Sequence, residues 1–136
     1  MKKSIIKTLS AFLVLLLVLS VLPMAAFASA SETFFQTNCS GFRCTGSGLI
    51  TSTQVNAYFS ATALPNAAVQ PDECYSSVVH VEVYNSTGTK TGETTSYGNT
   101  ETSATYVYSG AVHEILCKFE FAGWNLGEYT LPNSQD

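Results

Sequence analysis

The aromatic residues have the clearest capacity to bind a partner. Residues 31–136 contain six phenylalanines, seven tyrosines and one tryptophan, Trp124. Tyr58, Tyr84 and Tyr106 lie in strand-like segments, beside Asn, Thr and Glu side chains, and Trp124 lies in a turn-like Ala-Gly-Trp-Asn sequence. Exposed rings stack on sugars or anchor proteins because they offer a large contact area at little entropic cost. These four residues form the candidate binding surface. The alternative is that the rings cap the domain and pair across strands.

The two histidines are the candidates for metal binding. His80 and Glu82 lie two residues apart on one face of a strand-like segment, so convergence with His113 would create a zinc or copper site. His113, however, follows the alternation of Ile115, which points inward, and no third strong ligand is evident. We therefore predict no metal site and no cofactor.

No residue grouping typical of an enzyme is present in the sequence. The Gly-x-Ser-x-Gly turn of serine hydrolases is missing, and the glutamates that glycoside hydrolysis would need, such as Glu82, Glu114 and Glu120, are scattered. A domain of 106 residues also has little room for a deep pocket. We therefore predict no catalytic residue and no enzymatic activity.

The four cysteines, Cys39, Cys44, Cys74 and Cys117, all follow residue 30. An even number in a small exported domain predicts two disulfides, and the lack of a Cys-x-x-Cys pair argues against a thioredoxin-type redox motif or a zinc knuckle. The preferred pairing is Cys39–Cys44, around a tight turn, with Cys74–Cys117. The alternative is Cys39–Cys117 with Cys44–Cys74. In the chain-entropy model the 74–117 bridge contributes about 4 kcal/mol and the 39–44 bridge about 2 kcal/mol.

Alternating apolar and polar residues predict the elements that position these side chains. Residues 54–63, 77–84, 104–108 and 113–121 alternate with period two, and no segment after residue 31 shows a sustained helical period. Turn sequences separate these runs roughly every ten residues. The pattern predicts an all-β domain, a small antiparallel β-sandwich of six to eight strands that is immunoglobulin-like in the broad sense. A small β-barrel is the alternative.

Two segments, residues 64–74 and 87–103, lack the regular alternation of the predicted strands. Residues 64–74 contain Leu-Pro-Asn and Gln-Pro-Asp turns and form a long loop, of the length that is often functional or mobile. Residues 87–103 are rich in Thr and Ser, and we expect a mobile edge hairpin there.

Residues 1–30 have the layout of a secretory signal peptide. A basic start at 1–7 precedes an apolar run at 9–22, and small-x-small patterns end at Ala28 and Ala30. We expect cleavage after one of these two alanines, which leaves residues 31–136 as a single domain. The alternative is an uncleaved membrane anchor. The lysine-rich start resembles signal peptides of Gram-positive bacteria, so we predict a secreted bacterial protein.

The charge of the remaining chain narrows the class of partner. Residues 31–136 carry three basic and ten acidic residues. This balance argues against nucleic acid and, after signal cleavage, against an anionic membrane, because both require clustered Lys and Arg. The sequence therefore predicts a non-catalytic binding module for an extracellular glycan or protein. A bacteriocin-like or toxin-like effector is the alternative, although such proteins are often cationic, and a small extracellular hydrolase is less favoured.

Overall fold

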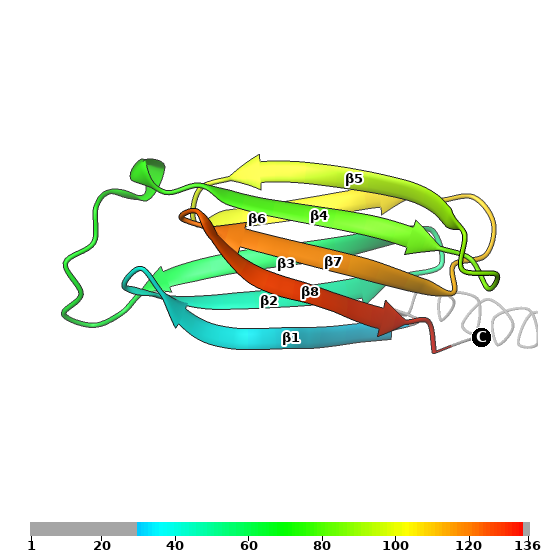
Figure 1. The fold of residues 1–136 in the computed structure, drawn as a ribbon, viewed down its shortest axis with the longest axis horizontal. Coiled ribbons are helices and arrows are strands. Elements are labelled where there is room, and N and C mark those ends of the chain that lie inside the picture. The colour runs from blue at the N-terminus through cyan, green and yellow to red at the C-terminus, as the bar shows by residue number, and fades with distance from the viewer. Residues whose placement is uncertain (1–29, 135–136) are drawn as a thin grey trace, which may run out of the picture.

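The computed structural model describes residues 30–134, which form two β-sheets (Figure 1). Residues 1–29, and with them nearly all of the predicted signal peptide, lie outside the described residues, as do 135–136. Within the described range no helix has the length and hydropathy needed to span a membrane. The strands are β1 (Ala30–Cys39), β2 (Phe42–Ile50), β3 (Gln54–Ala63), β4 (Ser77–Tyr84), β5 (Lys90–Gly98), β6 (Glu101–Val107), β7 (Glu114–Phe121) and β8 (Trp124–Pro132), with a short 3-10 turn, η2 (Asp72–Cys74), before β4.

The two sheets pack face to face as a β-sandwich, which confirms the predicted fold class. The first sheet has the strand order β1-β2-β3-β6 and the second β5-β4-β7-β8, and every neighbouring pair is antiparallel. The order of the second sheet matches the C′-C-F-G order of variable-type immunoglobulin domains. The first sheet differs because three consecutive N-terminal strands lie beside β6.

The core lies between the sheets and follows the predicted alternation. Buried and half-buried residues alternate without interruption along β4, and almost as regularly along β7. Each strand therefore has one face in the core and one towards solvent, as expected of a two-layer antiparallel fold. The buried apolar residues are Phe42, Cys44, Ile50, Val55, Ala57, Phe59, Val79, Val81, Val83, Ala104, Val112, Ile115, Cys117, Phe119, Phe121 and Leu131.

The strands β1, β2 and β8 were not predicted from alternation, and β2 shows why. Two of its inward positions are glycines, Gly46 and Gly48, so the apolar signal is lost. Rings from β1 fill the space that their side chains would occupy. A Cβ atom on Gly46 would lie 2.2 Å from Cε1 of Phe35, and one on Gly48 would lie 2.5 Å from Cζ of Phe34. A β-bulge between Thr33 and Phe35 brings these two consecutive rings to the same side.

The predicted edge hairpin at residues 87–103 is wrong in its pairing. β5 pairs with β4 in the second sheet, whereas β6 pairs with β3 in the first. The turn between Gly98 and Glu101 therefore crosses from one sheet to the other. Gly98 fits this crossing because a Cβ there would lie 2.3 Å from Oγ1 of Thr102.

The predicted disulfides are absent from the structure. All four cysteines lie in the described part of the chain, and each is a free thiol. Cys44 and Cys117 are buried in the core, Cys39 is half-buried, and Cys74 is exposed in η2. Neither the preferred pairing nor the alternative pairing is therefore present.

The position of Cys117 explains why it does not reach Cys74. Cys117 lies opposite Val81, four residues along β4 from its first residue, Ser77, and Cys74 precedes Ser77. Four strand residues span about 13 Å, whereas a disulfide needs Cα atoms within about 7 Å. Burial raises the pKa of the Cys117 thiol to about 12, as expected of a structural thiol in an apolar core.

Cys39 and Cys44 lie much closer together. Cys39 is opposite Phe42 and Cys44 is opposite Thr37 across the β1–β2 pair, so the two cysteines are diagonal neighbours. Such neighbours are about 7–8 Å apart at Cα, slightly beyond disulfide range. Burial, with the neighbouring Cys39 adding to it, raises the pKa of Cys44 to about 11. A bridge here would require a small movement of the turn.

Candidate functional site

The edge strands β1 and β8 lie side by side across the gap between the sheets, and we call this line of contact the seam (Figure 1). Stacked rings close its middle. The ring centroid of Tyr129 is 5.3 Å from that of Phe34 and 5.2 Å from that of Phe35, and Phe35 meets Phe119 edge-on at 5.3 Å. We call these four residues the filled half of the seam, because aromatic rings in such geometry replace water with packed apolar contact.

Two similar hairpin turns end the seam. Ser40 and Gly41 join β1 to β2 with φ values of 52° and 82°, and Ala122 and Gly123 join β7 to β8 with 52° and 80°. Positive φ at both central residues is the signature of the type I′ turn, whose twist suits antiparallel hairpins. The closing pairs are Cys39 opposite Phe42 and Phe121 opposite Trp124. Each hairpin thus pairs a phenylalanine of an inner strand with a residue of an edge strand.

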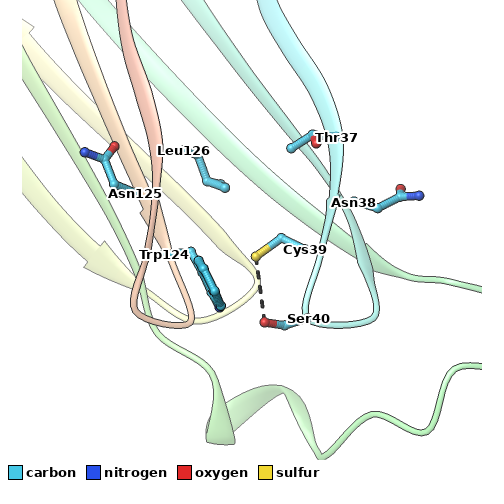
Figure 2. Close-up of a pocket in the computed structure, with 7 residues that line it drawn as sticks. All are labelled: Thr37, Asn38, Cys39, Ser40, Trp124, Asn125 and Leu126. Carbon is cyan, nitrogen blue, oxygen red and sulfur yellow. Dashed lines mark hydrogen bonds between the residues drawn. The ribbon is translucent and has the colours of Figure 1, made fainter.

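This arrangement leaves a pocket at the end of the sandwich. Phe42 and Phe121 meet edge-on in the core, with ring centroids 5.4 Å apart. Their partners Cys39 and Trp124 therefore face one another beyond the core, across a pocket of about 430 Å³ (Figure 2). Its volume is within the usual range for small-ligand sites, roughly 300–1,000 Å³. We call its lining the open half of the seam: Thr37, Asn38, Cys39, Ser40, Trp124, Asn125 and Leu126.

The lining of the open half is apolar at its centre and uncharged throughout. Trp124, Leu126, Cys39 and Ser40 are directed towards the gap, whereas the side chains of the two asparagines point away from it (Figure 2). The Cys39 thiol and the Ser40 hydroxyl are 3.7 Å apart and form a weak hydrogen bond. Trp124 is 63% exposed. No lining residue carries a carboxylate, ammonium, guanidinium or imidazole group.

The loop between β3 and β4, residues 64–76, lies at the same end and supports both turns. The Gly41 carbonyl accepts a hydrogen bond from Leu64 N, and the Ser76 carbonyl accepts one from Ala122 N, at 2.9 and 2.8 Å. Gly41 also packs closely on Val69. The long loop predicted at 64–74 thus holds the two hairpins in place beneath the pocket.

The structure does not bring the four predicted aromatic residues together. Tyr58 is 38% exposed on the outer face of the first sheet, where partial burial, and then the neighbouring Glu101, raise the pKa of its phenol. Tyr84 lies on the outer face of the second sheet. Tyr106 packs over Gly92 on the inward side. Of these four residues, only Trp124 lines the pocket.

The remaining residues of the open half were missed in the sequence analysis. Both turns were visible as Gly-containing sequences, but nothing in the sequence shows that residues 40 and 124 meet in space. That contact depends on β1 and β8 being edge strands on the same side of the sandwich.

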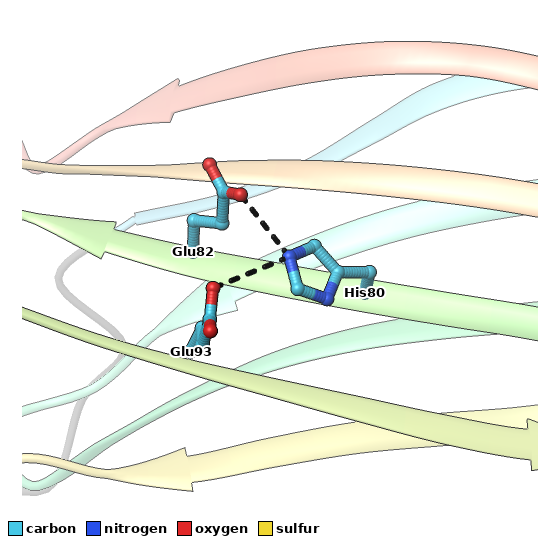
Figure 3. Close-up of side chains that lie close together, drawn as sticks. All are labelled: His80, Glu82 and Glu93. Atoms are coloured by element: carbon cyan, nitrogen blue, oxygen red, sulfur yellow. Dashed lines mark hydrogen bonds and ion pairs between the residues drawn. The ribbon is translucent and has the colours of Figure 1, made fainter. Parts of the chain in front are cut away.

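A second cluster of polar side chains lies on the outer face of the second sheet. His80 Nε2 is 3.2 Å from Glu82 Oε1 and 3.9 Å from Glu93 Oε2 (Figure 3). One ligand atom from each residue lies within 4.8 Å of the others, close enough for a single metal ion. Glu93 was not foreseen because its position depends on the register that sets it opposite Glu82. His113 is not part of this cluster.

Lysine ammonium groups already neutralise these carboxylates. Lys90 Nζ is 2.5 Å from Glu93 Oε2 and 3.8 Å from Glu82 Oε1, and Lys118 Nζ is 3.6 Å from Glu82 Oε1. A metal ion would have to displace Lys90 from Glu93 and would still have the Lys118 ammonium beside Glu82. The cluster is therefore better interpreted as an ion-pair network than as a metal site.

Glu82 is the centre of this network. The Tyr84 hydroxyl donates a 2.5 Å hydrogen bond to Glu82 Oε2. This bond first, and then His80, Lys118 and Lys90, hold the pKa of Glu82 at about 2, against the effect of partial burial. The same bond raises the pKa of Tyr84. The charged and hydrogen-bonding groups of the network are already paired with one another, so few of them are available to bind a ligand.

Comparison of the chain with known protein families, with curated proteins and with solved structures finds no match.

Proposed function

We propose that the protein is a small exported binding module whose site is the open half of the seam. The observation that carries the proposal is the exposure of Trp124, 63%, on the wall of a pocket built by two hairpin turns. Exposing an indole costs free energy that burial would recover, roughly 25 cal/mol per Å² of apolar surface. In the filled half, by contrast, stacked aromatic rings cover the gap between the same two strands, β1 and β8.

The position of the pocket supports a binding role. The turns at 40–41, 99–100 and 122–123 and the loop at 64–76 all lie at one end of the sandwich (Figure 1). In variable-type immunoglobulin domains the loops at one end of the sandwich form the binding surface. Rigid strands beneath such loops lower the entropic cost of binding.

The partner is an extracellular glycan or protein. The proposal does not include catalysis, because the lining of the open half offers no carboxylate or imidazole for acid–base chemistry. We also propose no nucleic-acid partner, because the acidic surplus of the chain opposes polyanions. No feature of the described residues favours a growth-inhibiting effector or a hydrolase over a binding module.

Binding is tested by screening purified protein against immobilised glycans and extracellular proteins. Trp124 is the sole tryptophan, so its fluorescence reports occupancy directly. Trp124→Ala is expected to weaken binding about tenfold or more. Tyr97→Ala is the matched control, because Tyr97 is 79% exposed but lies on β5, away from the pocket. Equal affinity of wild type and Trp124→Ala for every partner found would remove the proposal.

Export and oxidation form a separate part of the proposal. We propose that the signal peptide is removed after Ala28, since Ala30 is the first residue of β1, lies opposite Ile50 and packs against the core. Outside the cell, Cys39 and Cys44 are the pair that bridges with the least movement. Mass spectrometry of the secreted protein should therefore find an N-terminal Ser29 and a 39–44 disulfide. Retention of Cys117 as a thiol is expected, because it is enclosed in the core.

A further inference from the structure

The open half of the seam differs from a typical protein-binding surface. Among the described residues, the exposed large hydrophobic side chains are Tyr58, Tyr97, Val107 and Trp124. The first three lie on β3, β5 and β6, whereas Trp124 is on β8. Protein interfaces usually centre on a contiguous apolar patch of several hundred Å² with a polar rim. Trp124 is a single exposed ring inside a pocket, which suits a compact ligand better.

Two residues of the lining, Ser40 and Thr37, carry hydroxyl groups, and Ser40 is directed towards the gap. Ser40 lies beside Cys39 opposite the indole, and Thr37 lines the pocket on the same strand. A hydroxyl both donates and accepts hydrogen bonds, as do the hydroxyl groups of a sugar. One face of a pyranose ring carries mainly C–H groups and packs on the face of an aromatic ring. An indole opposite hydroxyls therefore complements a sugar ring from both sides.

The charge around the pocket selects among sugars. The lining has no cation that would pair with a carboxylate, sulfate or phosphate group. Asp72 and Glu73 lie in η2 at the same end of the sandwich (Figure 1), and Glu120 lies opposite Asn125. One cation has a matching position, because Arg43 lies opposite Asn38. Three carboxylates therefore stand against one guanidinium near the pocket. These carboxylates would repel an anionic ligand, although water and salt weaken the effect.

We propose that the open half binds a neutral pyranose of a glycan, stacked on the indole of Trp124 with Ser40 and Thr37 hydrogen-bonded to its hydroxyl groups. The inference rests on the proposed binding function and specifies its ligand class. It also predicts a pH dependence. Because the groups that contact the sugar are an indole and two hydroxyls, the affinity stays nearly constant between about pH 5 and pH 8, where only histidine among unperturbed side chains titrates.

The test titrates the protein with cellotetraose, maltotetraose, mannotetraose and chitotetraose, and with hyaluronan and polygalacturonate fragments as anionic probes. Trp124 emission and isothermal calorimetry measure affinity. At least one neutral tetrasaccharide is expected to shift the emission and bind at least about tenfold more tightly than the anionic fragments. Trp124→Ala is followed by calorimetry and should weaken binding about tenfold or more.

Ser40→Gly tests the hydroxyl while preserving the turn. Ser40 has a φ of 52°, a conformation that glycine adopts freely, so the variant removes one hydrogen bond without straining the backbone. Its affinity should fall about threefold to tenfold, the usual effect of one such bond. Tyr97→Ala should bind like wild type. Circular dichroism confirms that each variant is folded.

The outcomes separate the two proposals. Lack of binding to all four neutral tetrasaccharides, or preference for the anionic fragments, overturns the sugar assignment. If a protein partner then binds in a manner that requires Trp124, the proposed function stands and only the ligand class is wrong. If sugars bind equally well to wild type and Trp124→Ala, the site itself is wrong and both proposals fail.

Discussion

The two halves of the seam use the same pair of edge strands for opposite purposes. In the filled half, Phe34, Phe35 and Tyr129 stack between β1 and β8 and exclude water. In the open half, which lies nearer the hairpin turns at the end of the sandwich, Cys39 and Trp124 face one another across a pocket. An aromatic ring is present in both, so composition does not decide which half is closed. The closing pairs of the two hairpins decide it, because they hold the phenylalanines inside and the edge-strand residues apart.

The largest expected effect comes from breaking the filled half. Phe35→Ala removes a ring that contacts Phe119 and Tyr129 and covers Gly46. The variant should lower the free energy of unfolding by about 2–4 kcal/mol, since truncation of a packed phenylalanine costs up to about 5 kcal/mol and this ring is only half-buried. Urea denaturation followed by circular dichroism measures the change. A cost below about 1 kcal/mol would show that these rings do not seal the seam.

Gly46→Ala sharpens the same point from the opposite strand. Its Cβ would lie 2.2 Å from the Phe35 ring, and the packing of Phe119 and Tyr129 against that ring limits its movement. Overpacking of this kind costs about 1–3 kcal/mol. In a Phe35→Ala background the cost should be much smaller, so a double-mutant cycle should give a coupling energy above about 0.5 kcal/mol. Additive costs would mean that the glycine is required for another reason.

The ion-pair network provides a contrast with the open half, because its polar groups contribute to stability rather than to binding. The folded-state pKa of Glu82, about 2, is below its ordinary value of 4.5. Its contribution is therefore complete above about pH 4.5 and is lost as the pH falls towards 2. Glu82→Gln should cost roughly 1–2 kcal/mol at pH 7 after allowance for solvent screening. The variant should also lose less stability than wild type between pH 4.5 and pH 2, as measured by denaturation at each pH.

The smallest effect on stability is expected in the open half. Trp124→Ala removes a ring that is 63% exposed, so the free energy of unfolding should change by less than about 1 kcal/mol. The measurement is urea denaturation followed by circular dichroism, with Tyr97→Ala for comparison. A loss as large as that of Phe35→Ala would show that Trp124 belongs to the structural part of the seam.

Much of the fold could be predicted from the sequence, because period-two alternation is a local signal. The alternating valines of β4 and apolar residues of β7 predict which face of each strand points into the core. β2 could not be predicted in this way, since Gly46 and Gly48 leave their inward positions to rings from another strand. The pairing of β5 and β6 with different sheets was missed for a related reason: a turn sequence does not reveal whether the chain returns to the same sheet.

The candidate site was predictable only in part. Trp124 was identified from its residue type and its turn, but the opposite wall of its pocket, residues 37–40, lies more than 80 residues earlier in the chain. Tyr58, Tyr84 and Tyr106 share its chemistry, and their separation follows from strand parity and sheet order, which set them on different faces. The predicted disulfides were wrong, and for Cys74–Cys117 the reason is the register, which places Cys117 too far along β7 to reach Cys74.

The exposure of Trp124 is the property on which the account depends most, and acrylamide quenching of its fluorescence measures it directly. Since the chain has one tryptophan, the signal comes from this site alone. We expect efficient quenching in the free protein, because Trp124 is 63% exposed, and protection when the pocket is occupied. Resistance to quenching in the free protein would mean that the indole is buried and that the seam is closed along its whole length.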